Sequence, residues 1–460
     1  MEKLSPKEAG LERIRDLDVL STIPEMLALQ VEKRPDAVGW KSWDPVKKSW
    51  RDWTFRQGYD EVQRWRHAFA GLGLTRGTRV AMLLPNCIEA VLFDQAALAN
   101  ALTPDREFSP MENRYLAQRP TLDRRDFALS WSAAGTGDFF SGKFMSDFER
   151  YVTDQFVGRD GWIAAKAAAE KLSGKGENNG VYLCKKETLI PRFDRPDARR
   201  VTDNLNYVNK LVEHVDIPVY FALIPGKVSV WADRLPEGAP NADESAILRE
   251  AAAASRARWV DVQGALQAHA GEDIYYRLDH HWTSLGAYYG YAALTEAMGL
   301  DPVPLSAYEK TTVSTDFNGT TFSSSGVRWM TPDVIDQYVP EDGVEVTSWF
   351  GAEPQTGSLY DWSKLEEKDQ YAFFMGGNQS LAVVRTEHTD APKLLIVRDS
   401  YTDSLVPFLT AHFSEIHLVD PRYNKTPLSG YLAENEIDQV LVLYSAANFV
   451  SDTNLFVLSK

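Results

Sequence analysis

Cysteine is scarce in this chain. Its 460 residues include two cysteines, Cys87 and Cys184, which lie in unrelated surroundings and lack the close spacing of zinc ligands. A disulfide framework needs a larger and more regular set of cysteines than this. The sequence therefore predicts neither a thiolate metal centre nor a fold held by disulfide bonds.

Long apolar runs and an excess of positive charge are also missing. The longest apolar-leaning stretch, residues 88–102, is interrupted by Glu89, Asp94, Gln95 and Asn100, so we do not expect it to cross a bilayer. The N-terminal stretch mixes both charge signs and lacks the apolar core of a signal peptide, which taken literally predicts a cytoplasmic protein. A net charge of −16 argues against nucleic-acid binding, because phosphate contacts need clustered Lys and Arg.

The remaining composition is that of a globular protein. Hydrophobic residues make up 44% of the chain and charged residues 25%, and the length suffices for two or three domains. Up to residue 103 the pattern alternates between helix and strand, which is typical of an α/β fold. In this part we expect helices at 23–31, 59–72 and 88–102, and strands at 38–40, 50–55 and 79–84.

The pattern changes at Pro104, where a polar linker begins and a second domain, residues 104–460, follows. This domain also reads as α/β. We expect its helices at 144–156, 162–172, 199–215, 244–254 and 264–270, and its strands at 181–183, 218–224, 258–262, 416–420 and 439–444. Residues 301–384 show little helical period, which predicts an irregular β insertion that walls a cleft.

The segment on which the functional argument rests carries Asp279, His280, His281 and Trp282, directly before a helix-like run at 284–294. Asp279 and His281 are two residues apart, so in an extended or turn segment they project the same way. An aspartate that orients a histidine is half of a nucleophilic triad, and the missing part is a hydroxyl group.

Ser400 is the best candidate for that hydroxyl. It follows a buried-type strand at 393–398 and precedes an apolar helix-like run at 405–409. A nucleophile at such a junction gains the free N–H groups of a helix start for an oxyanion. As an alternative, Ser400 caps this helix, and His281 is a structural histidine beside Trp282.

Metal binding by Asp279, His280 and His281 is a further alternative, which we disfavour. Adjacent histidines rarely ligate the same ion, and no third histidine stands at helical spacing. The sequence predicts no cofactor. We expect Trp282, Tyr401 and Arg398, which flank the catalytic candidates, to contact the substrate.

From Pro104 to its end, the chain resembles the DHHW proteins, relatives of the alginate O-acetylation proteins. The matching stretches are Glu112–Arg114, Asp154–Phe156 with Arg159–Asp160, Asn179–Tyr182, Asp279–Trp282, Gly376–Asn378 and Asp399–Tyr401. The resemblance implies a permuted SGNH hydrolase-like, flavodoxin-like fold. It also implies that Ser400 is the nucleophile, His281 the base and Asp279 its orienting carboxylate.

Two details of the site follow from the same resemblance. Arg398 stands where SGNH enzymes usually have a glycine before the Asp-Ser pair. The SGNH asparagine follows a core strand after the serine, which here implies Asn448 as an oxyanion donor together with the Ser400 backbone. Asn378 and Gly377 are the competing oxyanion element, although Gly and Asn are also the usual residues of a turn.

A second resemblance covers residues 22–103, which are similar to the opening of adenylate-forming acyl-CoA ligases. It rests on Trp53–Phe55, Gly71–Gly73, Gly77–Ala81 and Leu84–Asn86. The phosphate loop, the later aromatic-Gly-x-Thr-Glu segment and the C-terminal lysine of such ligases are absent from this sequence. We therefore expect residues 1–103 to be a truncated ligase-like fragment without adenylation activity.

The function implied by the DHHW resemblance is serine-dependent O-acetyl transfer to a polysaccharide, or hydrolysis of its acetyl esters. Such proteins work outside the cytoplasm or at the cell envelope, often beside a membrane-bound O-acyltransferase, and this sequence conflicts with that location. The alternative from another class is a non-catalytic glycan-binding module in which Asp279, His281 and Ser400 are structural.

Overall fold

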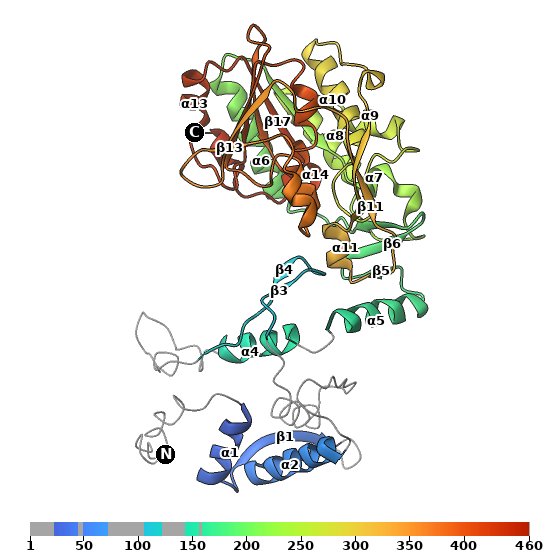
Figure 1. Cartoon of the computed structure of the whole chain (residues 1–460), viewed down its shortest axis with the longest axis vertical. Helices are drawn as coiled ribbons and strands as arrows, with labels where there is room; N and C mark the ends of the chain where they lie inside the picture. Colours follow the sequence, from blue (N-terminus) through green and yellow to red (C-terminus); the bar gives the residue numbers. More distant parts are fainter. Residues whose placement is uncertain (1–22, 45–48, 72–104, 122–142, 156–158, 460) are drawn as a thin grey trace. The chain divides into compact units, whose positions relative to one another are not determined.

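This computed structural model describes residues 23–44, 49–71, 105–121, 143–155 and 159–459 of the chain. The chain divides into two compact units (Figure 1). Unit 1 comprises Met1–Ser109 and Arg114–Trp162, and unit 2 comprises Pro110–Asn113 and Ile163–Lys460. Within the described ranges, every helix is too short or too polar to span a bilayer.

The described part of unit 1 begins with a helix, two strands and a second helix: α1 (Ile23–Lys33), β1 (Val38–Asp44), β2 (Ser49–Thr54) and α2 (Phe55–Gly71). β1 and β2 pair in antiparallel fashion over a small core of Leu27, Val31 and Val62. The helices predicted at 23–31 and 59–72 are confirmed as α1 and α2, and the predicted strand pair is confirmed as β1 and β2. The predicted strand at 79–84, the predicted helix at 88–102 and Cys87 lie outside the described residues, and the boundary after residue 103 stays a prediction.

The rest of unit 1 contains β3 (Phe108–Ser109), β4 (Arg114–Tyr115), α4 (Lys143–Asp154) and the start of α5 (Arg159–Leu172). An Arg114 guanidinium nitrogen donates to Asp154 Oδ2 at 2.8 Å, and the Ala117 backbone N–H donates to the same oxygen at 2.8 Å. Two stretches that carry the DHHW resemblance, 112–114 and 154–156, are thereby joined by a hydrogen-bonded ion pair.

Unit 2 is built on a mixed sheet of eight strands in the order β13-β12-β14-β16-β15-β17-β8-β9. From β16 to β9 neighbouring strands are parallel, and from β13 to β16 they are antiparallel. In chain order the strands are β8 (Val219–Ile224), β9 (Arg258–Trp259), β12 (Val344–Trp349), β13 (Gln355–Gly357), β14 (Leu381–Thr386), β15 (Lys393–Arg398), β16 (Glu415–Val419) and β17 (Gln439–Ser445). The predicted α/β class is confirmed.

Helices cover both faces of this sheet, which is why its central strands are hydrophobic throughout. Along β8, Tyr220, Ala222 and Ile224 belong to one core cluster, and Phe221 and Leu223 belong to the other. The first cluster is completed by α9 (Val262–Ala268), α10 (Ser284–Met298) and α12 (Val406–Leu409). The second is completed by α6 (Ala198–His214), α8 (Glu244–Ala254) and α13 (Leu428–Glu434).

Residues 301–384 are only in part the separate insertion that the sequence predicts. A two-stranded sheet of β10 (Thr311–Phe317) and β11 (Asp333–Gln337) stands apart, with α11 (Thr320–Ser325) between its strands. β12, β13 and β14 instead extend the central sheet beyond β16. The side chains of Ala382, Val383 and Val384 are buried, so β14 needs cover on both faces and finds it as a sheet strand.

Smaller elements complete unit 2. They include a three-stranded sheet of β5 (Glu177–Asn178), β6 (Val181–Cys184) and β7 (Thr188–Pro191), the short helices α7 (Lys227–Val230) and α14 (Ala446–Phe449), and the 3-10 turns η4 (Trp362–Glu366), η5 (Gln370–Phe373) and η6 (Ser400–Thr402). α7, η6 and α14 follow the carboxyl ends of the parallel strands β8, β15 and β17. In open α/β sheets this edge is where ligands bind.

The two hydrophobic clusters on the faces of the sheet predict how stability responds when a buried side chain is shortened. Val442 in the middle of β17 is fully buried, so Val442→Ala should lower the free energy of unfolding of unit 2 by about 2 kcal/mol or more. Val334, with 42% of its surface exposed, is the matched control, and Val334→Ala should change it by less than about 0.5 kcal/mol. Denaturant unfolding of both variants measures the difference, and equal losses would contradict this description of the core.

Candidate active site

A tight turn presents the Asp279–Trp282 segment. Tyr275 forms an antiparallel bridge with Trp282, and the Tyr276 N–H donates to the His281 carbonyl at 3.2 Å. Thr283 then caps α10, its hydroxyl oxygen accepting from the Gly286 N–H at 3.2 Å. The predicted helix after the histidines is confirmed, and its cap fixes the direction in which the turn leaves the helix.

Ser400 lies two residues after the last residue of β15, and its backbone belongs to η6. The cap of this 3-10 turn is Asp399, whose Oδ1 accepts from the Tyr401 N–H at 3.1 Å. Ser400 is therefore not the N-cap. The helix expected at 405–409 is confirmed as α12 (Val406–Leu409), and it begins six residues after Ser400. A buried strand that ends in a 3-10 turn leaves the Ser400 side chain partly exposed.

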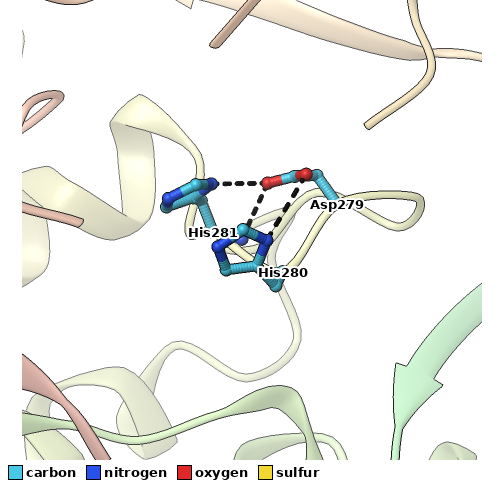
Figure 2. A group of neighbouring side chains, drawn as sticks. All are labelled: Asp279, His280 and His281. Carbon is cyan, nitrogen blue, oxygen red and sulfur yellow. Dashed lines mark hydrogen bonds and ion pairs between the residues drawn. The ribbon is translucent and has the colours of Figure 1, made fainter. Parts of the chain in front are cut away.

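Asp279, His281 and Ser400 form a continuous hydrogen-bonded chain. His281 Nδ1 lies 2.6 Å from Asp279 Oδ1, and His281 Nε2 lies 2.8 Å from Ser400 Oγ. A dashed line in Figure 2 marks the contact between His281 and Asp279. Asp279 and His281 are 1% and 5% exposed, so water hardly competes for these bonds. The carboxylate fixes a proton on Nδ1, which leaves Nε2 free to accept the serine proton.

Further contacts hold the two segments of this chain together. The Trp282 indole N–H donates to the Tyr401 carbonyl at 2.9 Å and lies 3.0 Å from the Ser404 hydroxyl. In return, the Tyr401 hydroxyl donates to the His280 carbonyl. The position of Ser400 relative to His281 is thus set from both sides by buried groups.

Two residues from distant parts of unit 2 support Asp279. Its Oδ2 accepts from the Thr320 N–H at 2.7 Å and from the Thr320 hydroxyl at 2.9 Å. The buried Lys227 ammonium donates to the backbone carbonyls of Tyr276, Arg277 and Asp279, the last at 2.7 Å. Burial lowers the pKa of Lys227 to about 8, although Asp333 and Asp279 oppose the shift.

The charges in this group favour a neutral His281. Burial, followed by the neighbouring His280, lowers the pKa of His281 to about 4. Burial alone would raise the pKa of Asp279, but His280 and His281 hold it well below its usual range. For His280, burial opposes protonation, but the Asp279 carboxylate outweighs it and raises the pKa. An ionised Asp279 beside a neutral His281 is the state that a general base requires.

Two aromatic rings fix the plane of the His281 imidazole. The Tyr371 ring is stacked on it with 3.7 Å between centroids and 6° between planes, and the His280 ring lies at 3.8 Å and 37°. The Tyr371 hydroxyl also lies 3.2 Å from the Ser400 carbonyl and 3.0 Å from the Ser404 hydroxyl. Tyr371 therefore contacts both the histidine and the turn that carries the serine.

Asn448 lies beside the Ser400 turn, as the sequence leads us to expect. Asp399 Oδ2 accepts from the Asn448 amide at 2.8 Å and from the Ser445 hydroxyl and N–H at 2.7 and 2.9 Å. One of the two amide hydrogens of Asn448 is used in this way, and the other remains for a ligand. Among the described residues, the Ser400 backbone N–H also has no hydrogen-bond acceptor.

Gly377 and Asn378 belong to a turn. Met375, Gly376 and Gly377 have φ values of 63°, 78° and 108°, so the chain reverses through three left-handed residues. Asn378 Oδ1 accepts from Arg422 at 3.4 Å. The described hydrogen bonds link neither Gly377 nor Asn378 to the Ser400 turn, and their oxyanion role stays a prediction that this geometry does not favour.

The predicted substrate contacts of Trp282, Tyr401 and Arg398 are not favoured either. Trp282 and Arg398 are 0% exposed and Tyr401 is 4% exposed, which leaves almost no surface for a ligand. Arg398 donates to Asp403 Oδ1 at 2.7 Å, a buried ion pair beneath the serine turn. The Arg398 side chain, at the position where SGNH enzymes usually have a glycine, is thus accommodated inside the core. Trp282, Tyr401 and Arg398 instead hold the turns that carry His281 and Ser400 in place.

The same group has the donor atoms of a metal site, since ligand atoms of Asp279, His280 and His281 lie within 4.8 Å of one another. Each is already engaged. His280 Nδ1 lies 2.6 Å from the Thr320 hydroxyl, which itself contacts Asp279, and His281 spans Asp279 and Ser400. An ion would have to break these bonds, so the donor set fits a proton relay better than a metal.

Sequence reasoning missed Thr320, Lys227 and Tyr371. Lys227 carried a weak signal, because it follows β8 at the carboxyl edge of the sheet. Thr320 and Tyr371 lie in the segment that reads as irregular, and no spacing rule links them to His281. Only the packed fold brings them to the site.

The charge arrangement predicts a titration result. His280→Gln removes the cation beside His281, so the pKa of His281 should rise toward the ordinary value of about 6.5. NMR titration of the His281 ring in both proteins measures this shift. Exposed His388 supplies the control, since His388→Gln should leave the His281 titration unchanged. An unchanged or lower His281 pKa in His280→Gln would contradict this description.

This chain is similar to a known protein family and to several solved structures. Residues 219–419 match the model of the family described as DHHW protein, and no curated protein matches the sequence. A DHHW family protein from Eubacterium siraeum has 26% identity and a TM-score of 0.54, over 61% of this chain and 95% of that one. Bacillus cereus PatB1, solved with a sulfonyl adduct, has 18% identity and a TM-score of 0.52, over 61% and 98%. The O-acetyltransferase domain of Pseudomonas putida AlgJ is more distant, with 16% identity and a TM-score of 0.38, over 59% and 93%.

The match to the family model lies within unit 2. The likeness to PatB1 shows a common fold, and none of the matches supports the ligase-like resemblance of residues 22–103. The family model covers β8 to β16 and includes the Asp279–Trp282 segment and Ser400. The resemblance to the DHHW family is thus confirmed, with the match to the family model covering residues 219–419 of this chain.

Proposed function

We propose that this protein is a serine O-acetyltransferase or acetylesterase of SGNH type that acts on a polysaccharide. The observation that carries the proposal is the hydrogen-bonded chain from Asp279 through His281 to Ser400, with bonds of 2.6 and 2.8 Å. The acetyl group and the polysaccharide are what the resemblance to the DHHW proteins and the alginate O-acetylation proteins implies.

The strand order supports the permuted SGNH-like fold. If the parallel strands are counted from β15, through β16 and β17, to β8 and β9, their spatial order becomes 2-1-3-4-5. This is the flavodoxin-like order, and in this chain its fourth and fifth strands come first. The nucleophile then follows the first strand of the series, and Asn448 follows the third.

In the proposed reaction, Ser400 Oγ attacks the carbonyl carbon of an acetyl ester while His281 Nε2 takes the serine proton. The Asp279 carboxylate stabilises the imidazolium that forms. The oxyanion accepts from the Ser400 backbone N–H and the remaining Asn448 amide hydrogen. His281 then gives its proton to the leaving alkoxide oxygen, and the acetyl group stays on Ser400.

The second half of the reaction releases the enzyme. A hydroxyl group of the glycan, or a water molecule, attacks the acetyl-serine carbonyl and gives its proton to His281 Nε2. The proton then returns to Ser400 as the new ester or acetate leaves. Supply of acetyl groups by a membrane-bound O-acyltransferase, and a location outside the cytoplasm, are further parts of this proposal.

The proposal predicts the behaviour of single substitutions on 4-nitrophenyl acetate. Ser400→Ala and His281→Ala should each lower kcat by at least about 10²-fold, because the first change removes the nucleophile and the second removes the base that activates it. Circular dichroism checks that both variants are folded. Ser451→Ala, at an exposed serine on the same unit, should keep the activity of the parent protein.

The same assay separates this function from its alternative. Turnover that persists unchanged in Ser400→Ala and His281→Ala would rule out the triad. A parent protein that binds oligosaccharides but hydrolyses no acetyl ester, and acetylates none in the presence of an acetyl donor, would favour the non-catalytic glycan-binding module.

A further inference from the structure

Two aromatic side chains of unit 2 are open to solvent at the edge of the sheet that carries Ser400. Phe350 is 51% exposed and follows the last residue of β12, and Trp362 is 55% exposed and begins η4. The Phe350 ring and Asp361 both approach Gly376, since a Cβ there would lie 3.8 and 3.7 Å from them. Phe350 and Asp361, the residue before Trp362, therefore flank one turn.

The register of the sheet places Phe350 in line with Ser400. β12, β14, β16 and β15 are neighbours, and the residues aligned at their ends are Trp349, Leu381, Val419 and Val397. Phe350 comes directly after the aligned residue of β12, Trp349, and Ser400 comes shortly after the aligned residue of β15, Val397. With strands about 4.8 Å apart, three spacings put the two positions roughly 15 Å apart along the edge.

A short segment also connects Trp362 to the catalytic group. The Trp362 and Phe373 rings form an edge contact with 5.3 Å between centroids. Phe373 ends η5, and the same turn carries Tyr371, which is stacked on His281 and contacts the Ser400 carbonyl. The exposed tryptophan is thus anchored on the element that orients the base.

Arg422 lies between these aromatic residues and the serine. It follows β16, the strand between β14 and β15, and one terminal nitrogen lies 3.4 Å from Asn378 Oδ1. Its Nε and the same nitrogen donate to Asp420. The guanidinium also lies over the Tyr423 ring, 5.4 Å from its centroid. Its other terminal nitrogen has no hydrogen-bond partner among the described residues, and the side chain is 32% exposed, so this N–H group can donate to a ligand.

The charge of this edge selects against an anionic ligand. Residues 350–370 contain five acidic and two basic residues. Of the basic ones, Lys364 pairs with Glu367 at 2.9 Å and Lys368 donates to the Asn318 carbonyl. The Arg422 charge is balanced by Asp420 at 2.6 Å. A polymer with a carboxylate on every sugar would meet net repulsion here.

We propose that Phe350, Trp362 and Arg422 form an acceptor subsite for a neutral oligosaccharide, which extends from Ser400 along the ends of β16, β14 and β12. This inference rests on the function proposed above and names its acceptor class. Sugar rings stack on the exposed aromatic faces, and the free Arg422 N–H group donates to a ring hydroxyl. Acetyl transfer would then modify neutral sugars and not polyuronates.

The test uses the full-length Ser400→Ala protein, so that no turnover disturbs binding. Isothermal titration calorimetry with cellohexaose, N-acetylchitohexaose and hexamannuronate compares two neutral probes with an anionic one. At least one neutral hexasaccharide should bind, and hexamannuronate should bind at least about tenfold more weakly. Adding Trp362→Ala should weaken the neutral complex by about tenfold or more, a loss of about 1.4 kcal/mol.

Trp329→Ala is the matched control, since Trp329 is 39% exposed in the same unit but contacts Lys171 on α5. It should leave binding unchanged.

Three binding results would overturn the subsite: no neutral probe binds, hexamannuronate binds best, or Trp362→Ala has no effect on binding. A changed sedimentation coefficient of Trp362→Ala would also overturn it, because it would identify this surface as a site of self-association. The proposed function fails by a different result, namely unchanged acetate turnover in Ser400→Ala. The two failures are therefore distinguishable.

Discussion

The site depends on the buried contact between the Asp279–Trp282 turn and the Ser400 turn, which are more than a hundred residues apart in sequence. The His281–Ser400 bond joins them, and the Trp282 indole and Tyr401 hydroxyl each donate across the same junction. Because these groups are buried, a displaced turn would leave polar atoms unpaired, which costs more than the bonds themselves contribute.

The rest of unit 2 serves this contact. The parallel strands deliver Ser400, Lys227 and Asn448 to one edge of the sheet, and α10 fixes the direction of the histidine turn. A neutral base beside an ionised carboxylate then follows from burial combined with the charge of His280. One packing arrangement therefore sets both the distances and the protonation states.

Much of this could be predicted from sequence, because local signals are strong where they exist. Continuous apolar runs identify β8, β15 and β17 as buried strands, and the spacing of Asp279 and His281 predicts their contact. Tertiary context decided the rest. β14 joins the central sheet, and Trp282, Tyr401 and Arg398 became core residues although their types suit a binding surface. Tyr371 and Thr320 reach His281 and Asp279 only through folding of the segment at 301–384.

Identification of the activated nucleophile by covalent labelling tests the central claim most directly. The protein is treated with an arylsulfonyl fluoride, which reacts with activated serines, and the modified peptide is found by mass spectrometry. The account predicts a single sulfonylated residue, Ser400, and no labelling there in His281→Ala, because the base no longer activates the hydroxyl. Labelling of another residue, or equal labelling of Ser400 without His281, would contradict it.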